Sequence, residues 1–383
     1  MAMDASEFSP VARAKLCKSG PDEVGAAGNL LETSQSGLPR DSPLLFVLWQ
    51  FVAMLEIALM MERLYPARLK AGDNICVVAV SGSVVELHEN LINKAVDVLQ
   101  SLGLTVSFSA HSMEKRKACA ADLENRVADL HDAFANPEVA AILIGVGGTN
   151  AIEMLPYMNF DLIRAHPKPI CGFSDATVIL NAIYSRTGII TYYGPMLFSF
   201  VVNIDPGYTL DYFRNALFLR SPFTLNPAIK WGNYTDLHSD MVNKGYQVIR
   251  EGDADGLLVG GHLPSLNLLQ GTAYLPELED AILFIEICER YGKSTIDKLS
   301  QYLGALMLQK GADKVRGLLV GRLFKDDTVT TDDLKNALLS RADLKDIPII
   351  INVDFGHTTP MVTLPIGGRI NILKGKMIIS NTE

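Results

Sequence analysis

The chain has 383 residues, of which 48% are hydrophobic and 20% charged, the composition of a soluble globular protein long enough for two domains. Its formal net charge of −9, without a Lys/Arg stripe, argues against a nucleic-acid partner. Five scattered cysteines without metal-ligand spacing are typical of reduced thiols in a cytoplasmic protein, so we expect no metal and no other cofactor.

The first 60 residues differ from the rest of the chain. Residues 1–43 are rich in Ser, Gly, Ala and Pro, which predicts a disordered extension. Residues 44–61 are nearly all apolar but include Gln50 and Glu56, and a charge near the middle of a membrane span costs about 2.5–3.5 kcal/mol. We interpret this segment as a helix packed on the body or as a non-native extension, with a membrane anchor as the alternative.

From residue 65 the pattern is that of alternating strands and helices. In chain order, the sequence predicts a turn at 69–73, strand 74–80, a helix from Ser81 to about Gly103, strand 105–109, helix 121–134 and strand 141–144. The turn Gly145-Val146-Gly147-Gly148 comes next, and it does not complete a G-x-G-x-x-G spacing. A phosphate cradle is therefore the weaker interpretation of these glycines.

The next stretch carries the most informative residue. A helical pattern through Leu155 leads to strand 169–173, then Ser174-Asp175, and then a helix that ends near Gly188. The order strand, glycine turn, helix, strand, serine, helix is typical of consecutive βα units in a parallel sheet. Residues 172–176 resemble a nucleophile elbow, the turn that raises a serine hydroxyl above the carboxyl ends of the strands.

The second half repeats this alternation. We expect a Gly-rich turn at 254–261, helices at 263–270, 293–311 and 330–339, strands at 280–287, 315–321 and 347–354, and a hairpin within 362–380. The predicted fold is α/β: an N-terminal parallel-sheet, flavodoxin-like domain carrying the elbow, and a C-terminal α/β domain with a short β-rich tail. The predicted boundaries are 1–60 for the extension, 61–235 for the nucleophile domain and 236–383 for the C-terminal domain.

Ser174, Glu286 and His357 all lie at or near the ends of apolar strands, where open α/β sheets place their sites. A serine needs an imidazole to take its proton, and the imidazole needs an acid to fix its tautomer. Each residue also has a structural interpretation: Ser174 as a helix N-cap, Glu286 as a surface acid and His357 as a core histidine. His262 is a rival base, and we favour His357 because it follows a longer buried strand.

An oxyanion hole completes such a site. The backbone N–H groups of Asp175 and Gly148 lie on neighbouring strand-end turns and are the candidate donors. A glycine at 148 is expected to let the backbone approach the substrate without an intervening side chain.

Residues 65–379 resemble the LD-carboxypeptidase family of serine peptidases. The likeness rests on an ordered series of motifs, among them Leu69–Asp73, Gly147-Gly148, Gly172–Asp175, Leu283–Glu286, Phe355–His357 and Leu364–Gly367. The resemblance implies a Ser-Glu-His triad on Ser174, Glu286 and His357, with Asp175 and either Gly147 or Gly148 as oxyanion donors. It also implies a site in the cleft between two domains, a homodimer and no metal.

Two branches of the family differ in substrate. One cleaves an amide beside an aminoacyl-sulfamoyl or phosphoramidate adenylate, and the other trims the terminal D-Ala from murein tetrapeptide. The turn at 147–150, together with Trp231 and Asp236, is more similar to the first, microcin-immunity branch. Three features depart from the family: His262 replaces an Asn, Val80 replaces a Pro, and residues 1–60 have no counterpart.

The sequence thus predicts a cytoplasmic serine carboxypeptidase or amidase that acts on a small peptide or a peptidyl or aminoacyl nucleotide, with no membrane contact. The alternative is a catalytically inactive family member that binds a peptide or nucleotide. A membrane-tethered hydrolase is a third hypothesis and rests on residues 44–61 alone.

Overall fold

The computed structural model describes residues 63–116, 120–202, 204–219, 221–234, 241–288, 294–325 and 328–380. The expectations for residues 1–60, including the apolar segment 44–61, lie outside these ranges, as does Asp236. Within them, no helix is both long enough and apolar enough to cross a membrane.

The first sheet has the flavodoxin-like strand order. Five parallel strands are ordered β5-β4-β3-β1-β2, and β15 pairs antiparallel with β5 at the edge. Their bounds are β1 (Asn74–Val78), β2 (Thr105–Phe108), β3 (Ala141–Ile144), β4 (Ile170–Gly172), β5 (Thr191–Tyr193) and β15 (Leu364–Ile366). The α/β class and the parallel N-terminal sheet predicted from the sequence are confirmed.

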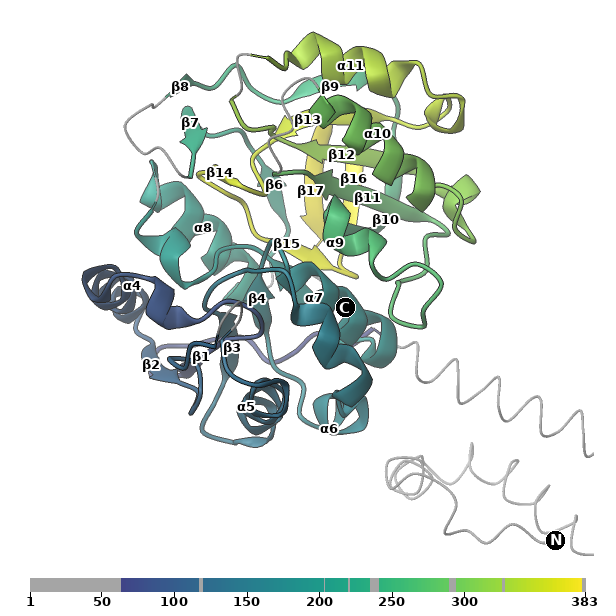
Figure 1. The fold of residues 1–383 in the computed structure, drawn as a ribbon. Coiled ribbons are helices and arrows are strands. Elements are labelled where there is room, and N and C mark those ends of the chain that lie inside the picture. The colour runs from purple at the N-terminus through teal and green to yellow at the C-terminus, as the bar shows by residue number, and fades with distance from the viewer. Residues whose placement is uncertain are drawn as a thin grey trace, which may run out of the picture. The chain divides into compact units, whose positions relative to one another are not determined.

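Helices cover both faces of this sheet (Figure 1). They are α4 (Glu89–Ser101) and α8 (Pro206–Leu217) on one face, and α5 (Leu123–Ala135), α6 (Phe160–Ala165) and α7 (Ala176–Thr187) on the other. Alternate residues of β1 show why, since Ile75 and Val77 pack in the core with α4 while Cys76 and Val78 pack in the core with α5. Strands buried on both faces read as continuous apolar runs, the pattern seen in the sequence.

The second sheet has eight strands, in the order β6-β17-β16-β10-β11-β12-β13-β9. Its strands are β6 (Phe223–Leu225), β9 (Gln247–Arg250), β10 (Ala254–His262), β11 (Ala281–Glu286), β12 (Gly317–Gly321), β13 (Ile349–Val353), β16 (Arg369–Leu373) and β17 (Lys376–Ser380). The central four strands are parallel, and β16 and β17 form the predicted C-terminal hairpin. The helices of this half are α9 (Leu263–Asn267), α10 (Ser294–Leu306) and α11 (Thr331–Leu339).

Shorter elements complete the described chain. A three-stranded sheet is ordered β14-β7-β8 and consists of β7 (Lys230–Asn233), β8 (Met241–Val242) and β14 (Thr358–Thr359). The 3-10 helices are η2 (Val84–Glu86), η3 (Ala151–Tyr157), η4 (Leu197–Phe200), η5 (Ala312–Lys314) and η6 (Ala342–Leu344). The helix expected from Ser81 to Gly103 is therefore divided into η2 and α4.

Residues 254–261 form a central strand, β10, so the expected Gly-rich turn is wrong. Its two glycines serve close packing between elements. A Cβ on Gly260 would lie 1.8 Å from the Phe284 carbonyl oxygen, and one on Gly261 would lie 2.7 Å from Thr177 Oγ1. Glycine is required here because β10 passes directly against β11 on one side and the start of α7 on the other.

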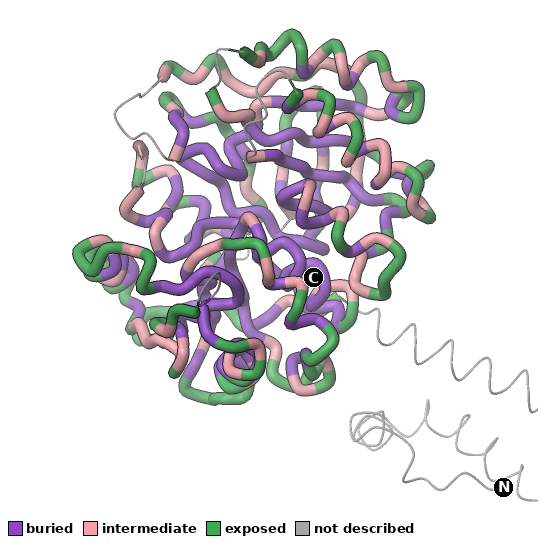
Figure 2. Tube along the Cα trace, viewed as in Figure 1, coloured by how far each residue is buried: buried purple, intermediate pink, exposed green. Residues whose placement is uncertain are grey.

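Helix α7 joins the two sheets. The Asn181 side chain donates to the Gly260 carbonyl at 2.9 Å, and the Thr177 hydroxyl accepts from the His262 N–H at 3.0 Å. One core cluster runs from the face of the first sheet that carries α5 and α7 into the second sheet. The central strands of both sheets are buried, whereas the edge strands β2 and β9 are partly exposed, and most other exposed residues lie on the outer helices and loops (Figure 2).

Candidate active site

Ser174 occupies a strained turn between β4 and α7. Its φ is +59°, in the left-handed region that non-glycine residues rarely adopt. Ser174 is half-buried, and its backbone carbonyl accepts from the Thr177 N–H at 3.0 Å, in the turn that leads into α7, whose N-cap is Asp175. A serine held at positive φ between a parallel strand and a helix has the geometry of a nucleophile elbow.

His357 lies against Ser174, although 183 residues separate the two in sequence. It follows β13 and precedes β14, and only 5% of it is exposed. Its Nε2 is 3.0 Å from Ser174 Oγ, within hydrogen-bonding distance. The rings of Phe173 and Tyr234, with centroids 5.0 and 5.6 Å from that of the imidazole, pack around it and limit contact with solvent.

Glu286 faces the other nitrogen of the imidazole. His357 Nδ1 is 3.0 Å from each carboxylate oxygen of Glu286, the last residue of β11. The Tyr193 hydroxyl donates to the same carboxylate at 2.7 Å, and burial together with the charge of Glu286 raises the pKa of this tyrosine well above its usual value. Burial alone raises the pKa of Glu286, but the charge and hydrogen bonds of His357 outweigh it, so the pKa falls below the usual 4.5.

The lowered pKa of Glu286 predicts how stability depends on pH. In the unfolded chain this carboxyl titrates near 4.5, so its contribution to stability is complete above that pH and is lost as the pH falls toward the lower folded pKa. Glu286→Gln cannot titrate and is expected to lose less stability than the wild type below about pH 4.5. Thermal unfolding followed by circular dichroism across this range measures the difference; parallel curves for the two proteins contradict the prediction. Glu279→Gln, at an exposed ion pair, is the control.

The ring nitrogens of His262, the rival base, lie close to Ser265 and Cys288. Its Nδ1 lies 2.8 Å from Ser265 Oγ, and its Nε2 lies 3.5 Å from Cys288 Sγ. The ring stands beside His357, with centroids 5.4 Å apart, so His262 borders the site. The ring nitrogen 3.0 Å from Ser174 Oγ belongs to His357. No three His, Cys, Asp or Glu side chains gather as a metal site in the part of the chain that the structure describes.

Gly147 and Gly148 lie in the turn after β3. The Gly147 carbonyl accepts from the Gly82 N–H at 2.8 Å, and the Gly148 N–H points the opposite way because the peptide is trans. A Cβ on Gly147 would lie 3.2 Å from Ser174 Oγ, whereas one on Gly148 would lie 2.1 Å from Ser81 Oγ. Gly147 is therefore the residue whose missing side chain leaves room at Ser174, and Gly148 lacks one because Ser81 packs against it.

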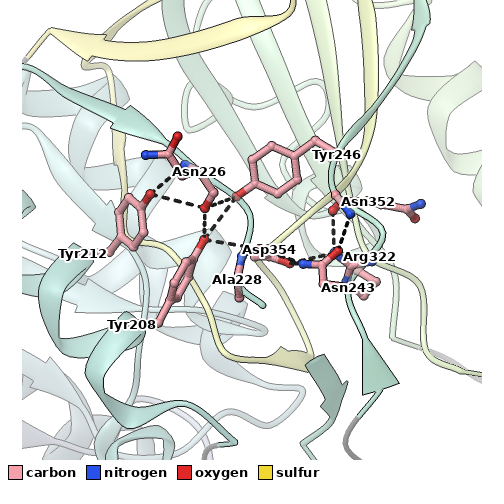
Figure 3. Close-up of polar contacts among 10 residues, drawn as sticks. Tyr208, Tyr212, Asn226, Ala228, Asn243, Tyr246, Arg322, Asn352 and Asp354 are labelled. Carbon is pink, nitrogen blue, oxygen red and sulfur yellow. Dashed lines mark hydrogen bonds and ion pairs between the residues drawn. The ribbon is translucent and has the colours of Figure 1, made fainter. Parts of the chain in front are cut away.

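A buried ion pair anchors the loop that carries His357 (Figure 3). Asp354 and Arg322 are 1% and 6% exposed, and the guanidinium also packs over Trp231 at 4.7 Å from the ring centroid. Asp354 accepts hydrogen bonds from Arg322 Nη2 at 2.7 Å, the Ala228 N–H at 2.8 Å, the Tyr208 hydroxyl at 3.2 Å and Asn243 Nδ2 at 3.3 Å. These contacts tie the end of β13, three residues before His357, to four other segments.

The sequence reasoning missed three contributors to this site: Tyr193, Arg322 and Asp354. Asp354 could have been found, since it directly follows an apolar strand, much as Glu286 ends one. Tyr193 carried no comparable signal, because a tyrosine in a buried strand is ordinary core composition.

A serine at the carboxyl edge of a flavodoxin-like sheet, within hydrogen-bonding distance of a histidine that pairs with a glutamate, both at or after the ends of strands of the second sheet, is an arrangement typical of a peptidase-like hydrolase. The chain belongs to the LD-carboxypeptidase family: residues 75–194 match the model of its N-terminal domain and residues 255–372 that of its C-terminal domain. Homologues and solved structures agree with this assignment.

Three similar proteins illustrate the relationship. YocD of Bacillus subtilis is 38% identical over 319 residues, which are 82% of this chain and 97% of that protein. The crystal structure of an MccF-like protein from Bacillus anthracis has a TM-score of 0.80 and 40% identity, covering 82% of this chain and 99% of that one. MccF in complex with glutamyl sulfamoyl guanosine has a TM-score of 0.73 and 26% identity, covering 83% of this chain and 98% of that one.

Proposed function

We propose that this protein is a serine carboxypeptidase or amidase that cleaves a small peptide or a peptidyl or aminoacyl nucleotide through an acyl-enzyme. The observation that carries the proposal is the hydrogen-bonded series Ser174–His357–Glu286, with 3.0 Å at each step. Family membership supports peptidase-like hydrolysis, and the geometry supports a serine mechanism.

In the proposed reaction, Ser174 Oγ attacks the carbonyl carbon while His357 Nε2 takes the hydroxyl proton. The carbonyl oxygen becomes an oxyanion that accepts hydrogen bonds from the N–H groups of Asp175 and of Gly148, or of Gly147 in its place. The C–N bond then breaks, and the leaving amine receives the proton from His357. Water attacks the acyl-enzyme by the same route, with its proton passing through His357, and restores Ser174.

Glu286 stabilises the imidazolium that forms in each step. Its lowered pKa keeps the carboxyl ionised at neutral pH, where it accepts the hydrogen of Nδ1 and leaves Nε2 to face the serine. Tyr193 fixes the carboxylate by donating to one of its oxygens. The base is thus held in the tautomer that the reaction needs.

The substrate class is inferred from the neighbours. MccF has been solved with glutamyl sulfamoyl guanosine, and this chain matches nearly the whole length of that structure. We therefore infer an aminoacyl or peptidyl nucleotide as substrate, with no cofactor. The domain boundary near residue 235, the homodimer and the cytoplasmic location stay predictions of the sequence.

An assay with two substrates tests the proposal. Wild type and Ser174→Ala are each given an aminoacyl-sulfamoyl adenosine and a murein tetrapeptide, and the products are identified by mass spectrometry. We expect the wild type alone to release the free amino acid from the adenosine compound. Loss of D-Ala from the tetrapeptide would instead assign the murein branch.

Equal cleavage by the wild type and Ser174→Ala contradicts a serine hydrolase. Cleavage of neither compound by folded protein points instead to another peptide substrate or to the inactive-relative alternative. Ligand binding without labelling of Ser174 by a fluorophosphonate would favour the inactive-relative alternative.

A further inference from the structure

The two proposed oxyanion donors come from separate loops. The Asp175 N–H follows β4, and the Gly148 N–H lies in the turn after β3. An oxyanion hole accelerates a reaction only if its donors are fixed before charge develops on the substrate, because reorganisation would otherwise cost energy in the transition state. Some contact must therefore fix the position of these two loops relative to each other.

The Ser81 hydroxyl is in contact with both loops. Its Oγ lies 2.6 Å from Asp175 Oδ2 and 2.9 Å from Asn150 Oδ1, and it accepts from the Asn150 N–H at 3.2 Å. A hydroxyl has one proton, and the shorter contact with the carboxylate takes it. The same oxygen blocks any side chain at Gly148, since a Cβ there would lie 2.1 Å away.

The Asp175 side chain reaches back toward the glycine turn. Its Oδ2 accepts from the Ala151 N–H at 2.9 Å as well as from Ser81. Asp175 is 2% exposed and Ser81 is fully buried, so water does not replace either contact. A buried carboxylate needs such donors, and each one it loses leaves charge without compensation.

Arg126 also contacts the segments that carry Ser81 and Asn150. This 2%-exposed guanidinium donates to the Val80 carbonyl at 3.0 Å and to the Asn150 carbonyl at 3.2 Å, the residues that flank the Ser81 contacts. Polar contacts thereby connect the segments that follow β1, β3 and β4.

We infer that Ser81 and the carboxylate of Asp175 are positioning residues that fix the two oxyanion donors relative to each other. The inference rests on the proposed function and extends it, because Asp175 then has two separate roles. Its backbone N–H touches the substrate oxyanion, and its side chain fixes where that N–H and the glycine turn stand. Removing either side chain leaves every proposed donor and the Ser174–His357–Glu286 series in the protein.

The expected effect is on kcat. Complete loss of one oxyanion donor costs about 10²–10³-fold, so displaced donors in Ser81→Ala are expected to lower kcat about 10- to 100-fold, with KM changed less than about twofold. Asp175→Ala should behave alike, and Asp175→Asn, which retains an acceptor oxygen, should recover most of the rate. The double variant Ser81→Ala/Asp175→Ala should be no slower than the slower single variant, because the two residues form one contact.

The experiment measures kcat and KM on aminoacyl-sulfamoyl adenosine, and the rate at which a fluorophosphonate labels Ser174. Labelling should slow together with kcat, since the phosphoryl oxygen occupies the same hole. Ser83→Ala is the matched control: it removes another fully buried hydroxyl two residues away, one that caps η2 and bonds the Ser112 carbonyl. Its kcat should stay within about twofold of the wild type.

The outcomes separate this inference from the proposed function. Unchanged kcat in folded Ser81→Ala and Asp175→Ala, with Ser174→Ala inactive, overturns the inference alone. A fall in both Ser81→Ala and Ser83→Ala, matched by equal losses of thermal stability, also overturns it, because the role is then structural. Wild-type protein that neither hydrolyses the compound nor labels at Ser174 overturns the proposed function and the inference with it.

Discussion

Ser174→Ala is expected to lower kcat by about 10⁶-fold while the protein stays folded, the size of loss that removing a serine nucleophile causes when a histidine base and an acid act with it. Oγ is the only atom removed, and it is the atom 3.0 Å from His357 Nε2. Without it, no acyl-enzyme forms. The rate that survives comes from the oxyanion donors and from substrate binding, which can still favour attack by water.

The interdependence of the residues gives a sharper test than the single variant. His357→Ala should lower kcat about as much as Ser174→Ala does, and the double variant should be no slower than either. The reason is that the serine is not activated without its base, and the base has no proton to take without the serine. Rates are measured on aminoacyl-sulfamoyl adenosine, with circular dichroism to show the fold. Ser185→Ala, on the same helix α7 but bonded to the Ala273 carbonyl, is the control and should keep the wild-type rate.

Losses that multiply in the double variant would mean that Ser174 and His357 act independently. The distance between them would then have no part in the chemistry, and the proposed serine mechanism would be wrong. A Ser174→Ala variant that keeps more than about a tenth of the rate would have the same meaning.

Much of the fold could be predicted because its strands are buried on both faces. Such strands read as apolar runs, and their alternation with helices indicated the parallel sheet that β1 to β5 form. The sequence pattern failed at β10, where Gly260 and Gly261 suggested a turn. Whether a glycine pair marks a turn or a close approach depends on the neighbours, here Phe284 and Thr177, which no local pattern contains.

The pairing of β15 shows a second limit. Residues 364–366 close the edge of the first sheet. The strand before them, β14, belongs to the three-stranded sheet, and the strand after them, β16, belongs to the second sheet. The sequence marked this segment as strand-like but could not assign its partner, because the pairing joins residues that are far apart in the chain, such as Leu364 and Tyr193. A division into domains made from the sequence alone therefore cannot show that β15 crosses back to the first sheet.

For the site, the useful signal was position rather than residue type. Ser174, Glu286 and His357 could be selected because each lies at or after the end of an apolar strand, Ser174 in the first sheet and the other two in the second. The same rule applied to Asp354 would have found it too. What no strand-end rule could supply is the side chain of Asp175, whose partners Ser81 and Ala151 lie 94 and 24 residues away.

Asp354→Ala is expected to destabilise the protein by about 3–5 kcal/mol, the cost of leaving one member of a buried ion pair without its partner. Arg322, 6% exposed, would keep its charge in a buried position, and its Nε already lacks a hydrogen-bond partner among the described residues. The Ala228 N–H would also lose its 2.8 Å acceptor. Since the same contacts hold the loop before His357, kcat should fall as well, and unfolding in urea together with steady-state kinetics measures both effects.

Two variants decide whether the buried pair is the cause. Asp346→Ala removes an aspartate whose ion pair with Lys345 is 82% and 71% exposed, and such pairs contribute only about 0–1 kcal/mol. Asp354→Asn keeps two acceptor or donor positions but no charge. Its free energy of unfolding should therefore lie between those of the wild type and Asp354→Ala. If Asp354→Ala and Asp346→Ala unfold at the same urea concentration, Arg322 finds other compensation and the loop of His357 is held by its packing against Phe173 and Tyr234 instead.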